Sequence, residues 1–378
     1  MNRLLYPALA VGLLATTYRL YLQPLLAQHG SGRVIESLGT AGCTTVPALS
    51  ACEKIVLHHG LLYLACSSPQ SRASWTPALN QLTPPPQEDY IATYDPKTSV
   101  ITRLETSLPG MMTHGMDVVS SSTNPSELYI FAINHRVPTH PESAPISGAN
   151  STIEVFKLPI GKSKLTHLRT FADPVILTPN DLVGSSDGES FFFTNDHNSK
   201  TSKMRYLSLL GLEYGSVGYC DTKSGCKYVA QNVHAANGIV RAPNNDTFYV
   251  ANSVGGGITV FERQSDNALL KTHTIPTDRG LDNLSMDSDG VIWAAGFPDG
   301  FAFVKHAADP SQLAPASAHS FAMNTGPGSF YGEKFKVTKV FENDGTIASG
   351  TTSVVHDVEN KRLYLHGLAS PHLTICPA

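Results

Sequence analysis

Five polar residues stand at equivalent points along this chain, each in a turn-like stretch ahead of a run of apolar residues. The pattern is plainest at Asn180, where Thr178-Pro-Asn-Asp181 and a glycine-containing turn lead into Ser190-Phe-Phe-Phe-Thr-Asn195. Aromatic and β-branched residues bounded by turn residues are typical of strands. Side chains of this kind could bind a metal ion or activate water if the fold brings them together. The five residues are Glu53, His114, Asn180, Asn237 and Asn283.

The apolar runs indicate how such a convergence would arise. A unit of short strands repeated along a chain is typical of a solenoid or a propeller. In a propeller, equivalent positions of successive blades lie around one axis and face one another. The sequence therefore predicts an all-β fold, a six-bladed β-propeller with a few short rim helices and an N-terminal apolar segment. The six expected strands lie near residues 62–65, 128–132, 190–195, 247–252, 291–295 and 363–366.

The chemistry of the repeated position favours a hard metal ion. Glu53 and Asp282 would supply two carboxylates, and three asparagines would supply amide oxygens. Such a set suits Ca²⁺, which takes about 6–8 oxygen ligands in flexible geometry, better than Zn²⁺ or copper. A plainer interpretation treats them as ordinary turn residues ahead of strands, but a register repeated from unit to unit favours the metal. The predicted ligands are Glu53, Asn180, Asn237, Asp282 and Asn283.

Two histidines have a place in the same pattern. His114 shares the register of the expected ligands, and His135 ends the strand that follows. In a pair of histidines, one imidazole can hold the proton while the other acts as a base near neutral pH. A single histidine among 15 is more often structural, so the prediction that His114 and His135 are catalytic depends on their pairing and register.

The composition narrows the class of protein. With 30 Gly, 25 Pro and 15% charged residues among 378, the chain suits a turn-rich all-β fold. Its net charge is −4 and it has no basic run, so nucleic acid is not an expected partner.

Residues 1–28 form a segment of their own, ahead of a propeller domain expected over 29–378. Met1-Asn2-Arg3 followed by an apolar run to Tyr18 has the layout of a secretory signal. Arg19 ends the run short of the roughly 20 apolar residues of a membrane span, although Leu20–Leu26 would extend it into an interfacial anchor. We expect a cleaved signal peptide or a retained apolar anchor. Both place the chain in the secretory pathway, extracellular or on the lumenal side, and the anchor adds association with a membrane or lipid surface.

The six cysteines agree with an oxidising compartment, because their number is even. Six cysteines allow 15 connectivities. The most plausible partners by position are Cys43 with Cys376, which would close the ring, Cys220 with Cys226 across a short loop, and the remaining Cys52 with Cys66.

Three sequons are present. Those at Asn150 and Asn245 lie in turn-rich segments and predict glycans. The third, at Asn283, is expected at the axis and therefore unmodified.

Other segments depart from the repeating strands. Ser68–Tyr90 contains Pro84-Pro-Pro86 and predicts a surface loop that could act as a lid. Met204–Leu212 predicts a rim helix, the alternative being part of a wall over the site or a membrane-facing patch. Strands are expected at 33–38 and 301–305, and 334–376 is expected to complete the sixth blade together with 29–42.

Six short motifs carry a family resemblance. They are Thr113-His-Gly115, Ile133-Asn-His135, Leu177-Thr-Pro-Asn-Asp181, Thr194-Asn-Asp-His197, Ala236-Asn-Gly238 and Leu281-Asp-Asn-Leu-Ser285. In this order they resemble the serum paraoxonase/arylesterase family over roughly residues 40 to 378.

The resemblance implies a propeller with a catalytic Ca²⁺ at its centre, held by residues matching the five ligands above. It implies hydrolysis of lactones and aryl esters, with promiscuous phosphotriesterase activity in some members. His114 and His135 match the proposed catalytic dyad of the family, and Cys43 and Cys376 match its ring-closing disulfide. A retained apolar N-terminus is common among members. The expected partner is thus a small ester or lactone, with water activated by His114 and an oxyanion stabilised by the metal.

Two competing functions are weighed against this one. The first is a metal-stabilised propeller that only binds partners. The second is a propeller enzyme similar to gluconolactonase or strictosidine synthase, against which the histidine pair and the terminal cysteines argue.

The sequence also departs from the family pattern. Lys54 stands where the family has an acid for a second, structural calcium, whose other matching groups are Asp181 and the backbone carbonyl of Met116. We expect the Lys54 ammonium to replace that metal and to pair with Asp181, and also with Asp117. The alternative is an outward-turned Lys54, with Asp117 as a replacement ligand. Phe297 replaces a pocket histidine of some relatives, and the 68–90 segment is this chain's own.

Overall fold

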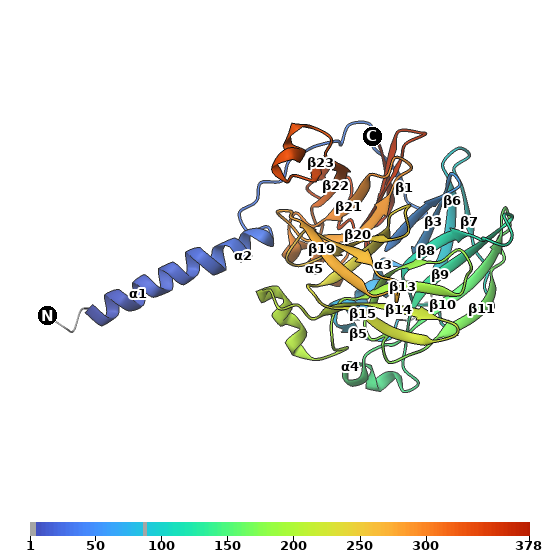
Figure 1. Ribbon diagram of the computed structural model, residues 1–378, viewed down its shortest axis with the longest axis horizontal. Coiled ribbons are helices and arrows are strands. Elements are labelled where there is room, and N and C mark those ends of the chain that lie inside the picture. The colour runs from blue at the N-terminus through green and yellow to red at the C-terminus, as the bar shows by residue number, and fades with distance from the viewer. Residues whose placement is uncertain (1–4, 86–88) are drawn as a thin grey trace.

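Six four-stranded antiparallel sheets form a ring in the computed structural model, which describes residues 5–85 and 89–378 (Figure 1). The predicted six-bladed β-propeller is confirmed. The strands of each blade are given from the axis outwards. Blade 1 contains β2 (Lys54–His58), β3 (Leu61–Cys66), β6 (Tyr90–Asp95) and β7 (Val100–Arg103), and blade 2 contains β8 (Thr113–Ser120), β9 (Glu127–Arg136), β10 (Asn150–Pro159) and β11 (Thr166–Phe171). Blade 3 contains β12 (Pro179–Gly184), β13 (Ser190–Asn195), β14 (Gly215–Asp221) and β15 (Gly225–Val233).

The second half of the ring has the same construction. Its strands are β16 (Ala236–Arg241), β17 (Thr247–Asn252), β18 (Ile258–Arg263) and β19 (Leu269–Ile275) in blade 4; β20 (Leu281–Met286), β21 (Ile292–Gly296), β22 (Ala316–Met323) and β23 (Phe335–Asn343) in blade 5; and β24 (Ser353–Asp357), β25 (Arg362–His366), β26 (Leu373–Pro377) and β1 (Thr44–Val46) in blade 6.

The central strands are apolar on both faces because each blade packs against two neighbours. In β13, Phe191 and Phe193 belong to the core shared with blade 2. Phe192 points to the opposite face, where its ring lies 4.5 Å from that of Phe248 in blade 4. Successive side chains of a strand alternate between faces, so an unbroken apolar run is what a strand between two packed blades requires.

The ring is closed by the two ends of the chain. β1 is the outer strand of blade 6 and pairs with β26, and a disulfide joins Cys43 to Cys376 beside this pair. The segment 29–42 thus leads into the closing strand, while β23 completes blade 5 instead of blade 6. All three pairings suggested by position are present, because disulfides also join Cys52 to Cys66 and Cys220 to Cys226.

The N-terminal segment extends away from the ring (Figure 1). It consists of α1 (Leu5–Thr17), a π-helical turn η1 (Tyr18–Leu22) and α2 (Gln23–Gln28), and the basic start expected at residues 1–3 lies outside the described residues. No helix in the described part of the chain combines the length and apolarity needed to cross a lipid bilayer.

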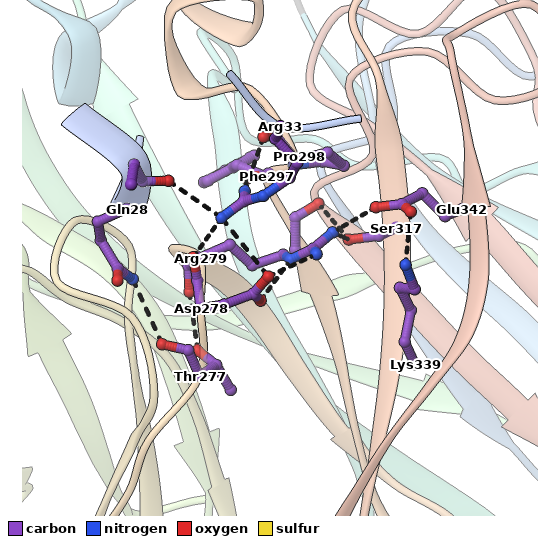
Figure 2. Close-up of polar contacts among 12 residues, drawn as sticks. Gln28, Arg33, Thr277, Asp278, Arg279, Phe297, Pro298, Ser317, Lys339 and Glu342 are labelled. Atoms are coloured by element: carbon purple, nitrogen blue, oxygen red, sulfur yellow. Dashed lines mark hydrogen bonds and ion pairs between the residues drawn. The ribbon is translucent and has the colours of Figure 1, made fainter. Parts of the chain in front are cut away.

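The segment after α2 is fixed to blade 5 by charged residues (Figure 2). Arg33 donates to the Pro298 carbonyl at 2.7 Å and lies 3.5 Å from the Asp278 carboxylate. Arg279 binds both Asp278, at 2.8 Å, and Glu342, at 2.6 Å. This network joins the N-terminal segment to the loop that follows Phe297, at the edge of the site described below.

Three local expectations are corrected. Residues 33–38 contain no strand but an isolated bridge from Leu38 to Glu342. Residues 301–305 lie in a helix, α5 (Gly300–Ala308), because the Asp299 side chain caps its first turn by accepting from the Ala302 amide at 2.9 Å. The predicted rim helix at 204–212 is a 3₁₀ helix, η4 (Lys203–Leu210).

The segment Ser68–Tyr90, here called the covering insertion, also has more structure than the expected loop. Ser68 caps α3 (Pro69–Ser74), which leads into a two-stranded ribbon. Residues 86–88 of the insertion, and with them Pro86, lie outside the described residues. The ribbon consists of β4 (Trp75–Thr76) and β5 (Gln81–Leu82) around η2 (Pro77–Leu79), and the remaining rim helices of the described chain are η3 (Pro141–Ser143), α4 (Ala144–Ser147) and η5 (Pro327–Tyr331).

Candidate active site

Four of the six innermost strands have the same irregularity at the predicted site residues. In each, two residues of the inner strand oppose one residue of the next strand, which is a β-bulge. A bulge bends the strand and changes the direction of its side chains, so its repetition places polar groups from four blades near the axis. The bulged pairs are His114-Gly115 in β8, Asn180-Asp181 in β12, Asn237-Gly238 in β16 and Asp282-Asn283 in β20.

Two of these pairs contain a glycine because neighbouring inner strands approach closely there. A Cβ atom on Gly115 would lie 2.3 Å from the carbonyl oxygen of Asn180. One on Gly238 would lie 2.4 Å from the amide nitrogen of Leu284. Any other residue would push the strands apart, so the glycines set the narrow spacing at the centre.

The centre contains buried oxygen atoms that are left without partners. Asn180 Oδ1, Asn237 Oδ1 and Asp282 Oδ1 accept no hydrogen bond from any described residue. Buried polar atoms are nearly always paired, and an exception indicates a missing water or ion. Three such oxygens on adjacent bulges are a suitable set of ligands for a hard cation.

Glu53 lies beside these oxygens and is held from two sides. Its carboxylate accepts hydrogen bonds from Asn283 Nδ2 at 3.0 and 3.1 Å and from Thr352 Oγ1 at 2.7 Å. Asn283 therefore turns its amide nitrogen to Glu53, while its oxygen lies 3.5 Å from Lys54 Nζ. In this orientation Asn283 supports Glu53, another of the predicted ligands, and a rotation of its amide would present the oxygen instead. Thr352 was not predicted, although it stands in the sixth repeat just ahead of an inner strand and so had the same signal.

The acids at the centre are poorly stabilised without a cation. Burial raises the pKa of Glu53 to about 7, against hydrogen bonds from Thr352 and Asn283 and the charges of Arg72 and Lys54. Burial also raises the pKa of Asp282 well above its usual range, and the charges of Glu53 and Asp181 add to this rise. A divalent ion would reverse both shifts, because an adjacent positive charge favours the carboxylate.

The donor set fits Ca²⁺ in kind. Within residues 5–85 and 89–378, no group of three or more His, Cys, Asp or Glu side chains has the arrangement of a metal site. The central set instead combines two carboxylates with asparagine amides, which are oxygen donors of the kind that Ca²⁺ accepts.

The two predicted histidines lie next to each other at this centre. Their ring centroids are 5.1 Å apart, and His114 Nε2 lies 3.4 Å from Asn180 Nδ2 and 3.7 Å from Glu53 Oε1. His135 Nδ1 is held by Ser151 Oγ at 2.9 Å, and its Nε2 has no partner among the described residues. The rings are thus in contact, and Ser151, which was not predicted, orients the second one.

Burial favours the neutral form of both imidazoles. Burial lowers the pKa of His114 well below its usual range, and the charges of His135, Arg72 and Lys54 add to this. Burial lowers the pKa of His135 to about 4, partly opposed by the charge of Asp196. A neutral imidazole can accept a proton from water.

Lys54 points towards the centre, as expected from its replacement of an acid. Its ammonium pairs with Asp181 Oδ2 at 2.7 Å and also donates to the Leu284 carbonyl at 3.2 Å. The outward-turned alternative is wrong. The expected pairing of Lys54 with Asp117 is wrong: Asp117 instead accepts hydrogen bonds from the backbone amides of Val118 and Gly184, both at 2.9 Å.

Behind Lys54 the central channel widens again. A cavity of about 490 Å³ lies along the far halves of the inner strands, and Lys54, Met116 and Asp117 are in its wall. Lys54 therefore separates the oxygen cluster from this cavity.

The covering insertion lies directly over the site. Trp75 Nε1 donates to the His135 carbonyl at 2.7 Å, and Arg72 Nη1 donates to the Thr113 carbonyl, next to His114, at 2.5 Å. Glu53 is 2% exposed and both histidines are 4% exposed. These contacts place the described part of the insertion against the strands that carry both histidines, and its action as a lid stays a prediction.

The surroundings of the site are partly apolar. The tilted rings of Phe297 and Phe303 lie with their centroids 4.2 Å apart, and Leu368 packs with them, as does Leu79 from the covering insertion. A cavity of about 10 Å³ remains beside His135, which is room for about one water molecule. Ala78, Ala149 and Leu177 line this cavity together with His135. Apolar groups beside a few polar ones are typical of sites for small organic molecules.

Two of the three sequons have the predicted setting, and Asn150 lies at the start of a strand instead of in a turn. Asn150 begins β10 and Asn245 lies in a turn, and both are exposed. Asn283 is 1% exposed and is not accessible to a glycan. Glycosylation at Asn150 and Asn245 stays a prediction.

Fold and site together define a six-bladed β-propeller with a buried, oxygen-rich centre and an adjacent pair of neutral histidines. Residues 96–372 match the family model Arylesterase, and the chain belongs to this family. The resemblance seen in the motifs is therefore confirmed.

Several curated relatives are serum paraoxonase/arylesterases. The chain is 30% identical to serum paraoxonase/arylesterase 2 of Gallus gallus over 61% of this chain and 60% of that one, and 29% identical to the Homo sapiens protein over 61% and 59%. In these matches the chain thus spans about 60% of the relative's length. The match to the Canis lupus familiaris protein is 27% identical and covers 94% of this chain and 96% of that one.

Solved structures with the same architecture are more distant. A luciferin-regenerating enzyme superposes with a TM-score of 0.51 at 12% identity, covering 91% of this chain and 95% of that one. The PQQ domain of a pyranose dehydrogenase from Coprinopsis cinerea superposes with a TM-score of 0.53 at 9% identity, covering 91% and 97%. At this identity the likeness concerns the fold alone.

Proposed function

We propose that the chain is a calcium-dependent carboxylic ester hydrolase that acts on lactones and aryl esters. The observation that carries the proposal is the group of unpartnered buried oxygens on the bulged inner strands, next to two neutral imidazoles. Membership of the arylesterase family supports it, as do the paraoxonase/arylesterase names of the relatives.

The ion would be held by residues that already converge. Glu53, Asn180, Asn237 and Asp282 offer oxygens as they stand, and Asn283 would do so after its amide rotates. When bound, Ca²⁺ would supply positive charge for the oxyanion that develops on the scissile carbonyl, and such stabilisation typically contributes about 3–4 kcal/mol.

His114 is the base in this proposal. Its neutral imidazole accepts a proton from the attacking water as the water oxygen bonds to the carbonyl carbon. That proton then passes to the departing alcohol or phenol oxygen, and the acyl group leaves as a carboxylic acid. His135 packs against His114 and is itself fixed by Ser151, so that the pair keeps one orientation.

The apolar residues and the covering insertion complete the site. The pair Phe297 and Phe303 provides a surface for an aryl or alkyl group. Closure of the covering insertion excludes bulk water, which strengthens every electrostatic interaction inside.

The test is turnover of a panel of lactones and of phenyl acetate, measured with and without a chelator. We expect hydrolysis that chelation abolishes and added Ca²⁺ restores. If the folded, calcium-loaded protein turned over none of them, the metal-stabilised binding propeller would be the better description. Turnover confined to sugar lactones would favour the gluconolactonase-like alternative. Paraoxon in the same panel tests for promiscuous phosphotriesterase activity.

We further propose a place for the protein at a lipid surface in the secretory pathway. Three disulfides agree with an oxidising compartment. The N-terminal segment exposes Leu9, Leu13, Leu14 and Leu20, which suits insertion into a lipid interface. Co-flotation with phosphatidylcholine vesicles, compared with a variant that has these leucines replaced by serine, tests the association; equal recovery of both proteins would contradict it.

A further inference from the structure

Arg72 brings a buried positive charge from the covering insertion to the site. It lies in α3 and is 4% exposed. Its Nη1 donates to the Thr113 carbonyl at 2.5 Å and lies 3.1 Å from Asp89 Oδ2. These contacts alone would describe a structural residue that fastens the insertion to β8.

The rest of the guanidinium is unused. Arg72 Nε and Nη2 are buried and have no partner among the described residues. These two nitrogens form one edge of the guanidinium plane, the edge that binds a carboxylate through two parallel hydrogen bonds. Leaving such donors buried and unpaired is costly, so the free edge requires an explanation.

The neighbouring carboxylate of Asp89 does not bind the free edge of Arg72. Asp89 reaches only Nη1, and its other oxygen accepts from Ser67 Oγ at 2.5 Å. The fold satisfies a comparable arginine fully at its two terminal nitrogens: Arg205 donates to the Lys200 carbonyl at 2.7 Å and to the Ala78 carbonyl of the covering insertion at 2.8 Å. Among the arginines of residues 5–85 and 89–378, Arg72 alone has buried side-chain nitrogens without a partner.

Arg72 contacts the backbone directly beside the proposed base. Its hydrogen-bond acceptor, Thr113, directly precedes His114. The charge of Arg72 also acts on three groups of the site. It helps the hydrogen bonds to lower the pKa of Glu53 against the effect of burial. It adds to the burial that lowers the pKa of His114 and His135. These three residues are the proposed ligand and the proposed dyad.

We propose that Arg72 is a specificity residue that binds a negatively charged group of the substrate. The preferred substrates are then esters or lactones that carry a free carboxylate near the scissile carbonyl. The carboxylate would take both hydrogen bonds of the Nε and Nη2 edge as the covering insertion closes. This inference rests on the proposed hydrolase function and names its substrate class.

The first experiment compares two esters that differ in one charge. Monophenyl succinate has a free carboxylate, and its primary amide analogue is neutral, while both release phenol. We expect the wild-type protein to have the higher kcat/KM for the anion. Arg72→Gln should lower kcat/KM for the anionic ester about 10- to 150-fold more than for the amide, the range expected for a hydrogen-bonded charged pair. Arg72→Lys, which keeps the charge without the planar edge, should recover only part of the loss.

Arg205→Gln is the matched control. It removes another arginine that fastens the covering insertion but has no free edge at the site, so it should affect both esters alike. Equal losses on both esters in Arg72→Gln would show that Arg72 only fastens the insertion. Absence of a preference for the anion in the wild-type protein would equally overturn the proposal.

A binding measurement separates this proposal from the hydrolase function itself. Calorimetric titration of the calcium-loaded protein with succinate needs no turnover. We expect Arg72→Gln to weaken succinate binding at least about tenfold, with Arg205→Gln near wild type. If no ester is hydrolysed but this difference is found, the hydrolase function fails and the anion site stands. If esters are hydrolysed but succinate binds both arginine variants and the wild type alike, the anion site fails alone.

Discussion

Replacing Lys54 by methionine tests directly how the centre of the propeller is stabilised. The substitution keeps the length of the side chain and removes the charge. Lys54 is buried, and its ammonium donates to Asp181 Oδ2 at 2.7 Å, to the Leu284 carbonyl at 3.2 Å and to Asn283 Oδ1 at 3.5 Å. The variant loses all three interactions at once.

The expected cost follows from the group left behind. Breaking a buried ion pair by removing one partner typically costs about 3–5 kcal/mol, because the other charge stays uncompensated. Asp181 would keep one hydrogen bond, from the Ile239 amide at 3.0 Å. We therefore expect Lys54→Met to lower the free energy of unfolding by about 3 kcal/mol at neutral pH, the lower end of that range.

The cost should depend on pH in a defined direction. Burial already raises the pKa of Asp181, opposed by the charge of Lys54. Without Lys54 the pKa of Asp181 rises further above its unfolded value. A group with a raised folded-state pKa stabilises the fold at low pH and loses that contribution as the pH rises. The difference between wild type and Lys54→Met should therefore shrink as the pH is lowered.

The assay is urea unfolding followed by tryptophan fluorescence, with disulfides intact and Ca²⁺ in excess. Lys54→Met/Asp181→Asn is the matched variant, because it removes both charges and should recover most of the loss. A cost below about 1 kcal/mol for Lys54→Met, or a double variant no more stable than the single one, would refute the reasoning, since contacting pairs are expected to couple.

Three further predictions concern the metal, the base and a structural histidine. Purified protein should hold one tightly bound Ca²⁺ per chain by atomic absorption, and Lys54→Asp should raise this towards two; two ions in the unmodified protein would contradict the replacement of a metal by Lys54. His114→Gln should lower ester turnover by about 10²–10⁴, the loss expected for a general base, with calcium affinity nearly unchanged in a chelator competition; a collapse of affinity would make His114 a ligand. Burial lowers the pKa of His366 to about 4, and the Gly367 amide donates a hydrogen bond to its Nδ1 at 2.8 Å. In the unfolded chain the pKa of this histidine is near 6.5, so the unfolded chain binds a proton at His366 more readily than the folded protein does. Stability should thus fall from pH 6.5 to 4, and His366→Gln should remove about 3 kcal/mol of that fall in urea unfolding curves; an unchanged pH profile would assign the fall to other groups.

The convergence of the site could be predicted from the sequence because it is a property of the repeat. Any propeller places equivalent positions of its blades at the axis, and Asn180 and Asn237 occupy such a position as predicted. The prediction that Asn283 shares it is wrong by one residue, because the bulge in β20 places Asp282 there. The β-bulges that direct the side chains could not be predicted from the sequence. A bulge is defined by how a strand pairs with its neighbour, with two residues of one strand opposite one residue of the other. Thr352 had the signal of register and was still not assigned a role.

The predictions failed where a single side-chain contact determines the local structure. Residues 301–305 read as a strand from Phe-Ala-Phe-Val, but short apolar runs do not distinguish a strand from a buried helix. The cap at Asp299 decided for the helix. Arg72 could not be recognised, because nothing in a polar, proline-rich segment shows which side chain turns inward. Its orientation depends on Thr113 and Asp89, which lie outside α3.

The number of ions that the centre can hold follows from its charges. Glu53 and Asp181 both act on Asp282, and Lys54 acts on all three acids, so we treat the four side chains as one electrostatic group. With all of them ionised, three carboxylates and one ammonium leave two negative charges. One divalent cation neutralises these charges, and a second would leave an excess of two positive charges in a poorly screened interior. If the centre binds calcium as proposed, Lys54 would therefore remove the negative charge that a second ion needs and leave the charge that the first ion needs.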